Sequence, residues 1–225
     1  EMEYNPGVTK LDAARQYFFP DGRPLKAGDI LKNPALAEVY KSLAKDGIKP
    51  FYQGWIAKSM VNAVQGSAIA PGALAIEDLT NYQAVEREPV CGVYRAHKVC
   101  GMAPPSSGGV TVLQILSLLE PYQLSKRPFE DVHTAHLFTQ ASRLAFADRN
   151  RYIADADFVD VPVDRMLSAE YIKQRSKQIN IHQDMGKAKA GEPVESLAYA
   201  DDNAYELPST SHISIVDKYG NAISM

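Results

Sequence analysis

Apolar residues recur at the three- and four-residue spacing of a helix in several stretches of the chain. The clearest stretch begins at Asn33-Pro34 and ends at Gly47. A capping residue, a first-turn proline and a terminal glycine in this order predict a complete helix. The remaining helical patterns cover residues 53–65, 76–79, 110–119, 131–150 and 168–179. We expect the first two long helices to pack as a helical hairpin, and residues 1–30 to be irregular.

Period-two patterns predict two strands, Gln83 to Val93 and His97 to Met102, joined by Arg95-Ala96. A two-residue loop at that point makes Cys91 face Cys100, in the class of strand pairs whose side chains approach most closely. This geometry is compatible with a cross-strand disulfide and equally with two reduced cysteines. The redox state of the compartment in which the protein works decides between them.

The buried helix of the chain is predicted at 110–119, because its residues are apolar nearly all round. The stretch that opens it is Pro104-Pro105-Ser106-Ser107-Gly108-Gly109. Either serine is suited to cap the first turn. The alternative is that the free amides hold a carboxylate or an oxyanion. The glycines permit close backbone packing.

Candidate metal ligands occur twice, and both patterns are incomplete. His133 and His136 lie one helical turn apart without a third ligand at a recognisable spacing, so surface or capping roles are the default. Asp155, Asp157 and Asp160 lack the glycine and distal glutamate of a calcium loop, which favours turn-forming roles.

The formal net charge of -3 over 225 residues, with no run of basic residues, gives no electrostatic footprint for nucleic acid. The longest apolar run, 110–119, is too short to span a bilayer. No Asn-X-Ser/Thr sequon occurs. These features favour a globular protein with a sizeable core, in one domain or two.

A polar segment, 180–209, lacks the apolar residues needed for a core and leads directly into a strand with Ile213, Ile215 and Val216. A flexible segment that ends on the Ser209-Thr210 bond is what self-cleavage requires. If Thr210 became a new N-terminus, its hydroxyl would be a nucleophile and its own α-amine the adjacent base. An ordinary loop followed by an edge strand is the alternative.

Several blocks in this order resemble the gamma-glutamyltransferase (gamma-glutamyl transpeptidase) family, over essentially all of residues 20–225. The blocks are Pro24-Leu25-Lys26-Ala27-Gly28-Asp29, Phe51-Tyr52-Gln53-Gly54, Glu77-Asp78-Leu79 with Tyr82, Val85-Glu86-Arg87-Glu88-Pro89, Pro104-Pro105-Ser106-Ser107-Gly108-Gly109, Ala147-Asp148-Arg149 and Thr210-Ser211-His212-Ile213-Ser214-Ile215-Val216-Asp217. Three of these blocks are highly specific: the last two and Pro104-Pro105-Ser106-Ser107-Gly108-Gly109, which we call the serine-glycine block.

The resemblance implies an α/β (α+β) fold, part of an αββα N-terminal-nucleophile hydrolase that is mostly helical with a small sheet. Residues 1–179 would be the helical portion of a large subunit, with a β-hairpin near 83–102. Residues 180–209 would be a flexible linker ending at the cleavage site, and 210–225 the truncated first strands of the small subunit.

The implied activity is self-cleavage between Ser209 and Thr210, followed by transfer of γ-glutamyl groups from glutathione and similar amides to water, amino acids or peptides. Thr210 is the catalytic residue, Ser211 and His212 are supporting residues, and neither a cofactor nor a metal is expected. His212 shares the strand face of Thr210 and is assigned an orienting role. The remainder of the small subunit would be its partner.

Other functions are compatible with parts of the same sequence. Cephalosporin acylases and poly-γ-glutamate capsule enzymes belong to the same family and share the processing threonine. The alternative outside the enzymes is a non-catalytic helical interaction module in which Thr210 is an ordinary residue. The family's substrate-binding arginine lies upstream of residue 1, and its α-amine ligands and oxyanion glycines lie downstream of Met225, so we expect the 225 residues alone to be catalytically silent. Family analogy and the missing sequons favour a bacterial periplasmic or secreted protein.

Overall fold

The computed structural model describes residues 9–128, 130–193 and 212–224. The chain divides into two compact units, residues 1–85 and 86–225, and no sequence pattern predicted this boundary. Within the described residues, none of the helices has the length and apolarity needed to cross a bilayer.

The first unit is helical. Its elements are α1 (Asp12–Phe18), the 3-10 helix η1 (Pro20–Gly22), α2 (Pro34–Asp46), α3 (Lys49–Tyr52), α4 (Trp55–Gln65) and α5 (Ile76–Thr80). The prediction for α2 is confirmed, because the Asn33 side chain accepts a hydrogen bond from the Leu36 amide and Gly47 ends the helix with a φ of 68°. Trp55 Nε1 donates to Ser42 Oγ at 3.2 Å, which links α4 to α2.

The prediction that residues 1–30 are irregular is wrong for α1. This short helix carries an ion pair one turn apart, from Arg15 Nη2 to Asp12 Oδ1 at 2.7 Å. Its sequence, DAARQYF, is rich in residues that favour helices. No residue of α1 is buried, so local preferences account for this helix.

The second unit begins with an antiparallel hairpin. Strands β1 (Val90–Tyr94) and β2 (His97–Gly101) pair in the predicted register, with Cys91 opposite Cys100. The two cysteines form a disulfide. The predicted strand over 83–89 is wrong: β1 starts only at Val90, because the residue before it, Pro89, has no amide hydrogen to extend the ladder, and the carbonyl of Met102, which would face it, accepts from the Gly109 amide.

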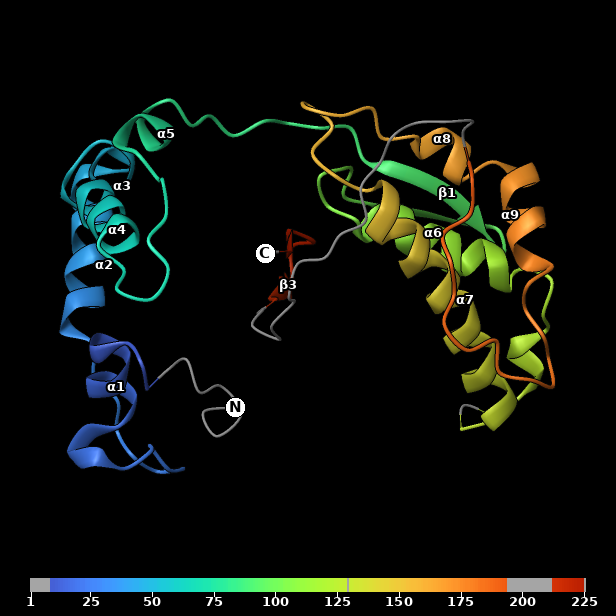
Figure 1. Cartoon of the computed structure of the whole chain (residues 1–225), viewed down its shortest axis with the longest axis horizontal. Helices are drawn as coiled ribbons and strands as arrows, with labels where there is room; N and C mark the ends of the chain where they lie inside the picture. Colours follow the sequence, from blue (N-terminus) through green and yellow to red (C-terminus); the bar gives the residue numbers. More distant parts are fainter. Residues whose placement is uncertain (1–8, 129, 194–211, 225) are drawn as a thin grey trace. The chain divides into compact units, whose positions relative to one another are not determined.

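Helix α6 (Gly108–Leu119) packs against both strands and against α7 (Val132–Tyr152), as Figure 1 shows. It is buried over most of its length, as predicted. Glycines allow its first turn to approach the hairpin: a Cβ on Gly109 would lie 2.5 Å from the Met102 carbonyl oxygen, and one on Gly101 would lie 2.6 Å from Gly109 Cα. The paired glycines are therefore required by backbone packing.

Helix α7 carries most of the remaining core. Asp131 caps it by accepting from the Thr134 amide at 3.0 Å, and Leu137, Ala141 and Leu144 are fully buried. Phe138, which we expected on the same stripe, is 53% exposed. The unit is completed by η2 (Leu124–Lys126), α8 (Val163–Met166), α9 (Ala169–Ser176), β3 (Ser214–Val216) and β4 (Ala222–Ser224).

The described part of the polar segment, residues 180–193, contributes to the core although it forms no helix or strand. Met185 and Ala188 pack against the cluster around Leu137, and Ala190 packs against the cluster around Val110. The expectation that nothing in this segment supports a core therefore fails for residues 180–193. Three scattered small or flexible apolar residues are too few to produce a periodic pattern.

The β1–β2 turn offers a stability prediction. Arg95 and Ala96 have φ values of 48° and 70°, and this left-handed region costs an L-residue about 1–2 kcal/mol. Glycine avoids this cost but loses more backbone entropy on folding, about 0.5–1 kcal/mol. We therefore expect Ala96→Gly to raise the free energy of unfolding by about 0.5–1 kcal/mol. Urea unfolding of the protein with its Cys91–Cys100 disulfide intact measures this change in the free energy of unfolding. Ala96→Val should lower stability, and an unstable glycine variant would contradict the turn geometry.

Candidate functional site

The sequence-predicted site residues fall mostly outside the described part of the chain. Ser209, Thr210 and Ser211 lie among residues 194–211, which the structure does not describe, so their assigned roles stay predictions. His212 is described and is exposed. The geometry that bears on Thr210 therefore comes from the strand that follows it and from the segment that precedes it.

The strand after Thr210 is half of a second antiparallel hairpin, β3–β4, with Ser214 opposite Ser224 and Ile215 opposite Ile223. Asp217 holds its turn: Oδ1 accepts from the amides of Tyr219 at 2.8 Å and Asn221 at 2.9 Å, and Oδ2 accepts from Asn221 Nδ2 at 2.8 Å. Gly220 supplies a φ of 86°. Every residue of the two strands is exposed.

His212 joins the two strands of this hairpin. Its Nε2 lies 3.0 Å from Ser214 Oγ and 3.2 Å from Ser224 Oγ. Ser214 and Ser224 face each other across the two strands, so these contacts place the His212 side chain on their face of the hairpin. Ser224 was not predicted, because a residue twelve positions away reaches His212 only through the turn at Asp217.

The turn at Asp217 predicts a pH dependence. The hydrogen bond from the Asn221 side chain, followed by the backbone amides, lowers the pKa of Asp217 below its usual 3.8. A lowered folded-state pKa means that this stabilisation is complete above pH about 3.8 and is lost as the pH falls through the lower folded value. The Asn221 and Tyr219 amide NMR signals should report that midpoint. In Asp217→Asn the acid-dependent shift should disappear; a midpoint above 3.8 would contradict the prediction.

A buried polar cluster brings together α6, α7 and α9. Asp148 and Arg175, which are 1% and 2% exposed, form a two-pronged ion pair: Nη2 to Oδ1 at 2.9 Å and Nε to Oδ2 at 3.1 Å. Gln114 Nε2 donates to Asp148 Oδ2 at 3.3 Å and to the Met166 carbonyl at 3.2 Å. The aspartate of the Ala147-Asp148-Arg149 block therefore links three helices.

The same cluster binds the backbone of the segment that leads toward Ser209. The Gly191 amide donates to Asp148 Oδ1 at 2.8 Å, and Arg175 Nη2 donates to the Lys189 carbonyl at 2.9 Å. Tyr152 donates its hydroxyl to the Gly191 carbonyl at 2.6 Å. Both hydrogen-bonding groups of Gly191 are thus satisfied by the helical core, which fixes the chain at this point.

Burial sets the electrostatics of this cluster. Desolvation raises the pKa of Asp148, and the charge of Arg175 opposes that shift. Desolvation also raises the pKa of Tyr171, with a further increase from the Asp148 charge. The opposing guanidinium and the donated hydrogen bonds are what allow a carboxylate to occupy this interior position.

The serine-glycine block meets the Ala147-Asp148-Arg149 block at the start of α6. Arg149 Nε donates to Ser107 Oγ at 3.4 Å. The predicted capping role belongs to Ser106, whose Oγ accepts from the Gly108 amide at 3.3 Å; Ser107 makes no side-chain cap. The Gly109 amide donates to the Met102 carbonyl at 3.2 Å. One of these two amides donates to a serine side chain and the other to a backbone carbonyl of the protein itself, which favours capping over the anion-binding alternative.

Arg175, Gln114, Gly191 and Tyr152 are the residues of this cluster that sequence reasoning missed. One signal was available: Arg175 lies on the same helical stripe as Tyr171, Ile172 and Ile179, and a charge on a buried stripe needs a partner. The partner itself, Asp148, is 27 positions away, and no spacing rule connects the two.

The two incomplete metal patterns are occupied by protein contacts. His136 Nε2 lies 2.8 Å from the Asn180 carbonyl. Asp157 forms an ion pair with Arg87 at 2.5 Å, while Asp155 Oδ1 accepts from the Asp157 amide at 3.0 Å, so the aspartates do shape a turn. Among the described residues, no group of three or more His, Cys, Asp or Glu side chains is arranged to hold a metal.

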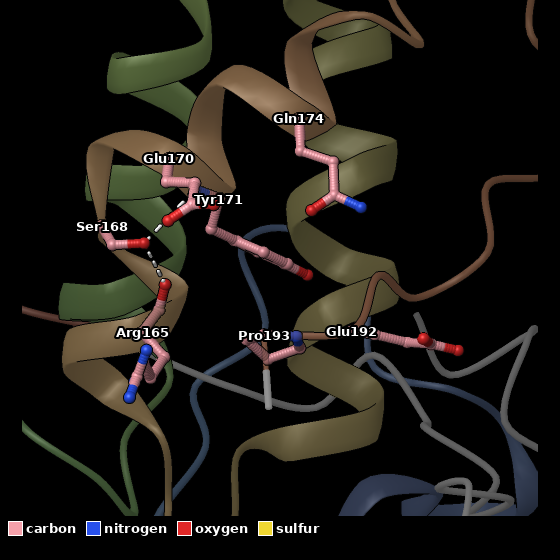
Figure 2. Close-up of a pocket in the computed structure, with 7 residues that line it drawn as sticks. All are labelled: Arg165, Ser168, Glu170, Tyr171, Gln174, Glu192 and Pro193. Carbon is pink, nitrogen blue, oxygen red and sulfur yellow. Dashed lines mark hydrogen bonds between the residues drawn. The ribbon is translucent and has the colours of Figure 1, made fainter. Parts of the chain in front are cut away.

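A cavity of about 510 Å³ adjoins the polar cluster (Figure 2). Tyr171 reaches across it from α9 toward α7, and Glu192 and Pro193 line it from the segment after Gly191. His212 is not among the described residues that line it. Among the described residues, the cavity is therefore a feature of the α9 region and the start of the segment after Gly191.

Comparison with known proteins decides the family. The family model described as gamma-glutamyltranspeptidase matches residues 2–225. The chain belongs to this family. A curated relative, the glutathione hydrolase proenzyme of Escherichia coli K12, is 37% identical over 212 residues, covering 94% of this chain and 35% of the relative. The proenzyme of the same name from Bacillus subtilis subsp. natto is 35% identical, covering 94% of this chain and 37% of its own length.

A solved member of the family has the same fold. The gamma-glutamyltranspeptidase of Helicobacter pylori matches with a TM-score of 0.68 at 33% identity, over 82% of this chain and 53% of that one. The predicted fold class, an N-terminal-nucleophile hydrolase fold that is mostly helical with a small sheet, is confirmed. The chain spans about a third of the length of the curated relatives it matches.

Members with other names also match. The Acylase ACY 1 proenzyme of Pseudomonas sp. strain SE83 is 32% identical, and the Capsule biosynthesis protein CapD proenzyme of Bacillus anthracis is 30% identical. Similarity at this level spans relatives with different names, so family membership by itself does not select the substrate.

Proposed function

We propose that the full-length protein is a self-cleaving gamma-glutamyl transpeptidase, or glutathione hydrolase, whose nucleophile is Thr210. The observation that carries the proposal is the family match over residues 2–225, in which the block Thr210-Ser211-His212 stands at the start of the β3–β4 hairpin region. The names of the relatives, glutathione hydrolase proenzymes, support both the activity and the precursor.

Self-cleavage would proceed by an N-to-O acyl shift. The Thr210 hydroxyl attacks the Ser209 carbonyl carbon, the Ser209-Thr210 C–N bond breaks, and the Thr210 nitrogen takes up a proton as the free amine. Water then hydrolyses the resulting ester and restores the hydroxyl. The products are a chain ending at Ser209 and a chain beginning at Thr210, which corresponds to the proposed large and small subunits.

The matured Thr210 would then act on γ-glutamyl amides. Its α-amine, with a reference pKa of about 7.7–8.0, accepts the proton of the hydroxyl as the oxygen attacks the γ-carbonyl of glutathione or a related amide. The leaving amine departs protonated, and a γ-glutamyl-threonyl ester remains. Water or the amine of an amino acid or peptide acceptor takes the acyl group, which predicts ping-pong kinetics.

One of the two supporting residues, His212, would act through hydrogen bonds on one face of the hairpin. We assign His212 an orienting role, supported by its contacts with Ser214 and Ser224, and we retain Ser211 as a supporting neighbour. Neither is assigned the base role, since the α-amine fills it. The proposed boundaries are residues 1–209 for the large-subunit part, with 180–209 as the linker, and 210–225 for the start of the small subunit.

A second candidate is an acylase or a capsule enzyme of the same family, favoured by the matches to proteins with those names. These would share the cleavage and differ in the acyl group transferred. A panel of glutathione, a glutaryl-cephalosporin and poly-γ-glutamate separates them by the ratio of kcat/KM values. The primary proposal expects the highest value for glutathione.

For the location of the protein, we propose the periplasm or the outside of the cell. The Cys91–Cys100 disulfide supports it, since disulfides persist in oxidising compartments. Cell fractionation followed by thiol labelling tests it: the expected result is an unlabelled protein in the periplasmic or secreted fraction, and a labelled cytosolic protein would contradict it.

The experiment for the main proposal is the intact mass of the full-length protein before and after incubation. We expect two fragments divided between Ser209 and Thr210, together with hydrolysis of γ-glutamyl-p-nitroanilide that appears as the fragments form. A chain that remains whole on long incubation would favour the non-catalytic helical module. Hydrolysis by the 225 residues alone would contradict the expectation that groups outside them bind the substrate.

A further inference from the structure

The Cys91–Cys100 disulfide lies on the outer face of the β1–β2 hairpin. The inner face packs against α6, where a Cβ on Gly92 would lie 2.9 Å from Leu113 Cδ2. Side chains alternate along a strand, so Cys91 and Cys100, each next to a residue of the Gly92–Val99 pair, point to the other face. Both cysteines are exposed. We propose that this disulfide is an exchange site for an anionic small thiol such as glutathione, which opens the bond and loosens the hairpin.

A purely structural role explains this disulfide poorly. Nine positions separate the two cysteines, and cross-links that close short loops stabilise a fold least. The strand register is also held by contacts that do not involve the cysteines. Val90 packs against the core cluster around Val110, and Arg95 in the turn donates to the Tyr122 carbonyl. The hairpin should therefore survive the loss of its cross-link, with less rigidity.

Lys98 gives the outer face of the hairpin a positive charge. Val93 and Lys98 form the next pair on the face of the disulfide, so Lys98 is diagonal to Cys91 and two positions from Cys100. Long side chains reach across such diagonals. Lys98 is exposed, and it is the charged residue of these two pairs. An ammonium group beside a disulfide attracts an anionic thiol and stabilises the thiolate that leaves.

The exchange consumes two thiols and forms one new disulfide. The thiolate of a first glutathione attacks Sγ of one cysteine, the Cys91–Cys100 bond breaks, and the other cysteine leaves as a thiolate that takes up a proton. The thiolate of a second glutathione attacks the glutathione sulfur of the mixed disulfide. Oxidised glutathione departs, and the second cysteine is also protonated. Two electrons pass to the protein. The inference rests on the proposed function only for glutathione as the thiol at hand.

Opening the bond should be detectable where the hairpin meets α6. A two-stranded hairpin is marginally stable by itself, so a hairpin without its cross-link opens more often. Met102 follows β2 directly, and its carbonyl accepts from the Gly109 amide at 3.2 Å. Reduction should therefore raise the hydrogen-exchange rates of the Gly92, Val99 and Gly109 amides by at least about tenfold. The Leu144 amide, in the buried part of α7, should keep its rate.

The first experiment follows the disulfide in the full-length protein. The Thr210→Ala variant, which we expect not to consume the thiol, is incubated with glutathione, alkylated and mapped by mass spectrometry. A glutathionyl group should appear on Cys91 or Cys100, and both cysteines should then become alkylated. S-methylglutathione has the same charges and no thiol, so it should leave the bond closed. A bond that glutathione opens only after unfolding in urea would overturn the inference.

Lys98→Gln tests the role of the charge. Its exchange with glutathione should be at least about threefold slower than that of the parent protein, the size expected for one exposed charge. Exchange with 2-mercaptoethanol, a neutral thiol, should keep its rate, because it gains nothing from an ammonium group in the approach. Lys98→Arg is the matched control and should exchange normally. Equal slowing toward both thiols, or no slowing with glutathione, would overturn the inference.

A double variant, Cys91→Ser with Cys100→Ser, reproduces the open hairpin without a reductant. Its hydrogen-exchange rates in β1, β2 and at Gly109 should match those of the reduced protein, and rates equal to those of the oxidised protein would overturn the inference. The exchange does not need Thr210. A disulfide that opens in a full-length protein that never cleaves would refute the proposed function alone, whereas a closed disulfide in a protein that cleaves would refute only the exchange site.

Discussion

Thr210→Ala should leave the full-length protein as one uncut chain and remove its γ-glutamyl transferase and hydrolase activity, a loss of at least about 10³-fold. The reason is that alanine offers no oxygen, either to attack the Ser209 carbonyl or to carry the γ-glutamyl group. Thr210→Ser keeps the hydroxyl and should retain both steps at reduced rates. Intact mass reports cleavage and release of p-nitroaniline reports turnover.

The failure to mature and the failure to turn over can be separated. The two parts can be produced as separate chains, one ending at Ser209 and the other starting at residue 210, so that no cleavage is needed. With threonine at 210 the assembled pair should be active, and with alanine it should be inactive. Ser211→Ala serves as the matched neighbour and should retain cleavage. An alanine variant at 210 that still matures would refute the assignment.

Arg175→Met should lower the free energy of unfolding by about 3–5 kcal/mol, the usual cost of leaving a buried charge without its partner. Asp148 is 1% exposed, so water cannot replace the guanidinium. The double variant Asp148→Leu with Arg175→Met removes both charges and should recover part of the loss. Urea unfolding of the full-length protein, arranged as a double-mutant cycle, gives the coupling between the two.

The pH dependence of this penalty follows from the raised pKa of Asp148. A folded-state pKa above the unfolded value of 3.8 means that the folded protein holds the proton more tightly. The stability contributed by Asp148 is therefore complete below pH about 3.8 and declines as the pH rises through the folded value. The cost of Arg175→Met should be smaller at acidic pH, where the carboxyl is neutral. A penalty that grows toward acidic pH would contradict this account.

The elements that could be predicted from the sequence are those in which several local signals indicate the same structure. The helix at Pro34–Asp46 has its cap, its first-turn proline and its terminal glycine in the sequence. The β1–β2 register followed from two cysteines placed symmetrically about Arg95-Ala96, although only the structure selected the disulfide from the two alternatives. The buried character of α6 followed from its apolar composition.

Two of the misses arise from contacts between residues that are far apart in the sequence. Nothing near Arg175 indicates that its partner is Asp148, and nothing near Gly191 indicates that Tyr171 leaves no room for a side chain. The α1 helix was missed although its stabilising features are local, namely residues that favour helices and an ion pair between Asp12 and Arg15. The family resemblance identified the importance of the Ala147-Asp148-Arg149 block, and the structure supplies a reason for it.

The most direct test of the account is to find the acyl group on Thr210. The matured full-length enzyme would be mixed with a γ-glutamyl amide, quenched in acid during turnover and digested for peptide mapping by mass spectrometry. We predict that the peptide beginning at Thr210 gains one γ-glutamyl group, labile to base as an ester is, and that no other peptide does. A γ-glutamyl group on another residue, or steady turnover with the Ser209-Thr210 bond intact, would contradict the central claim.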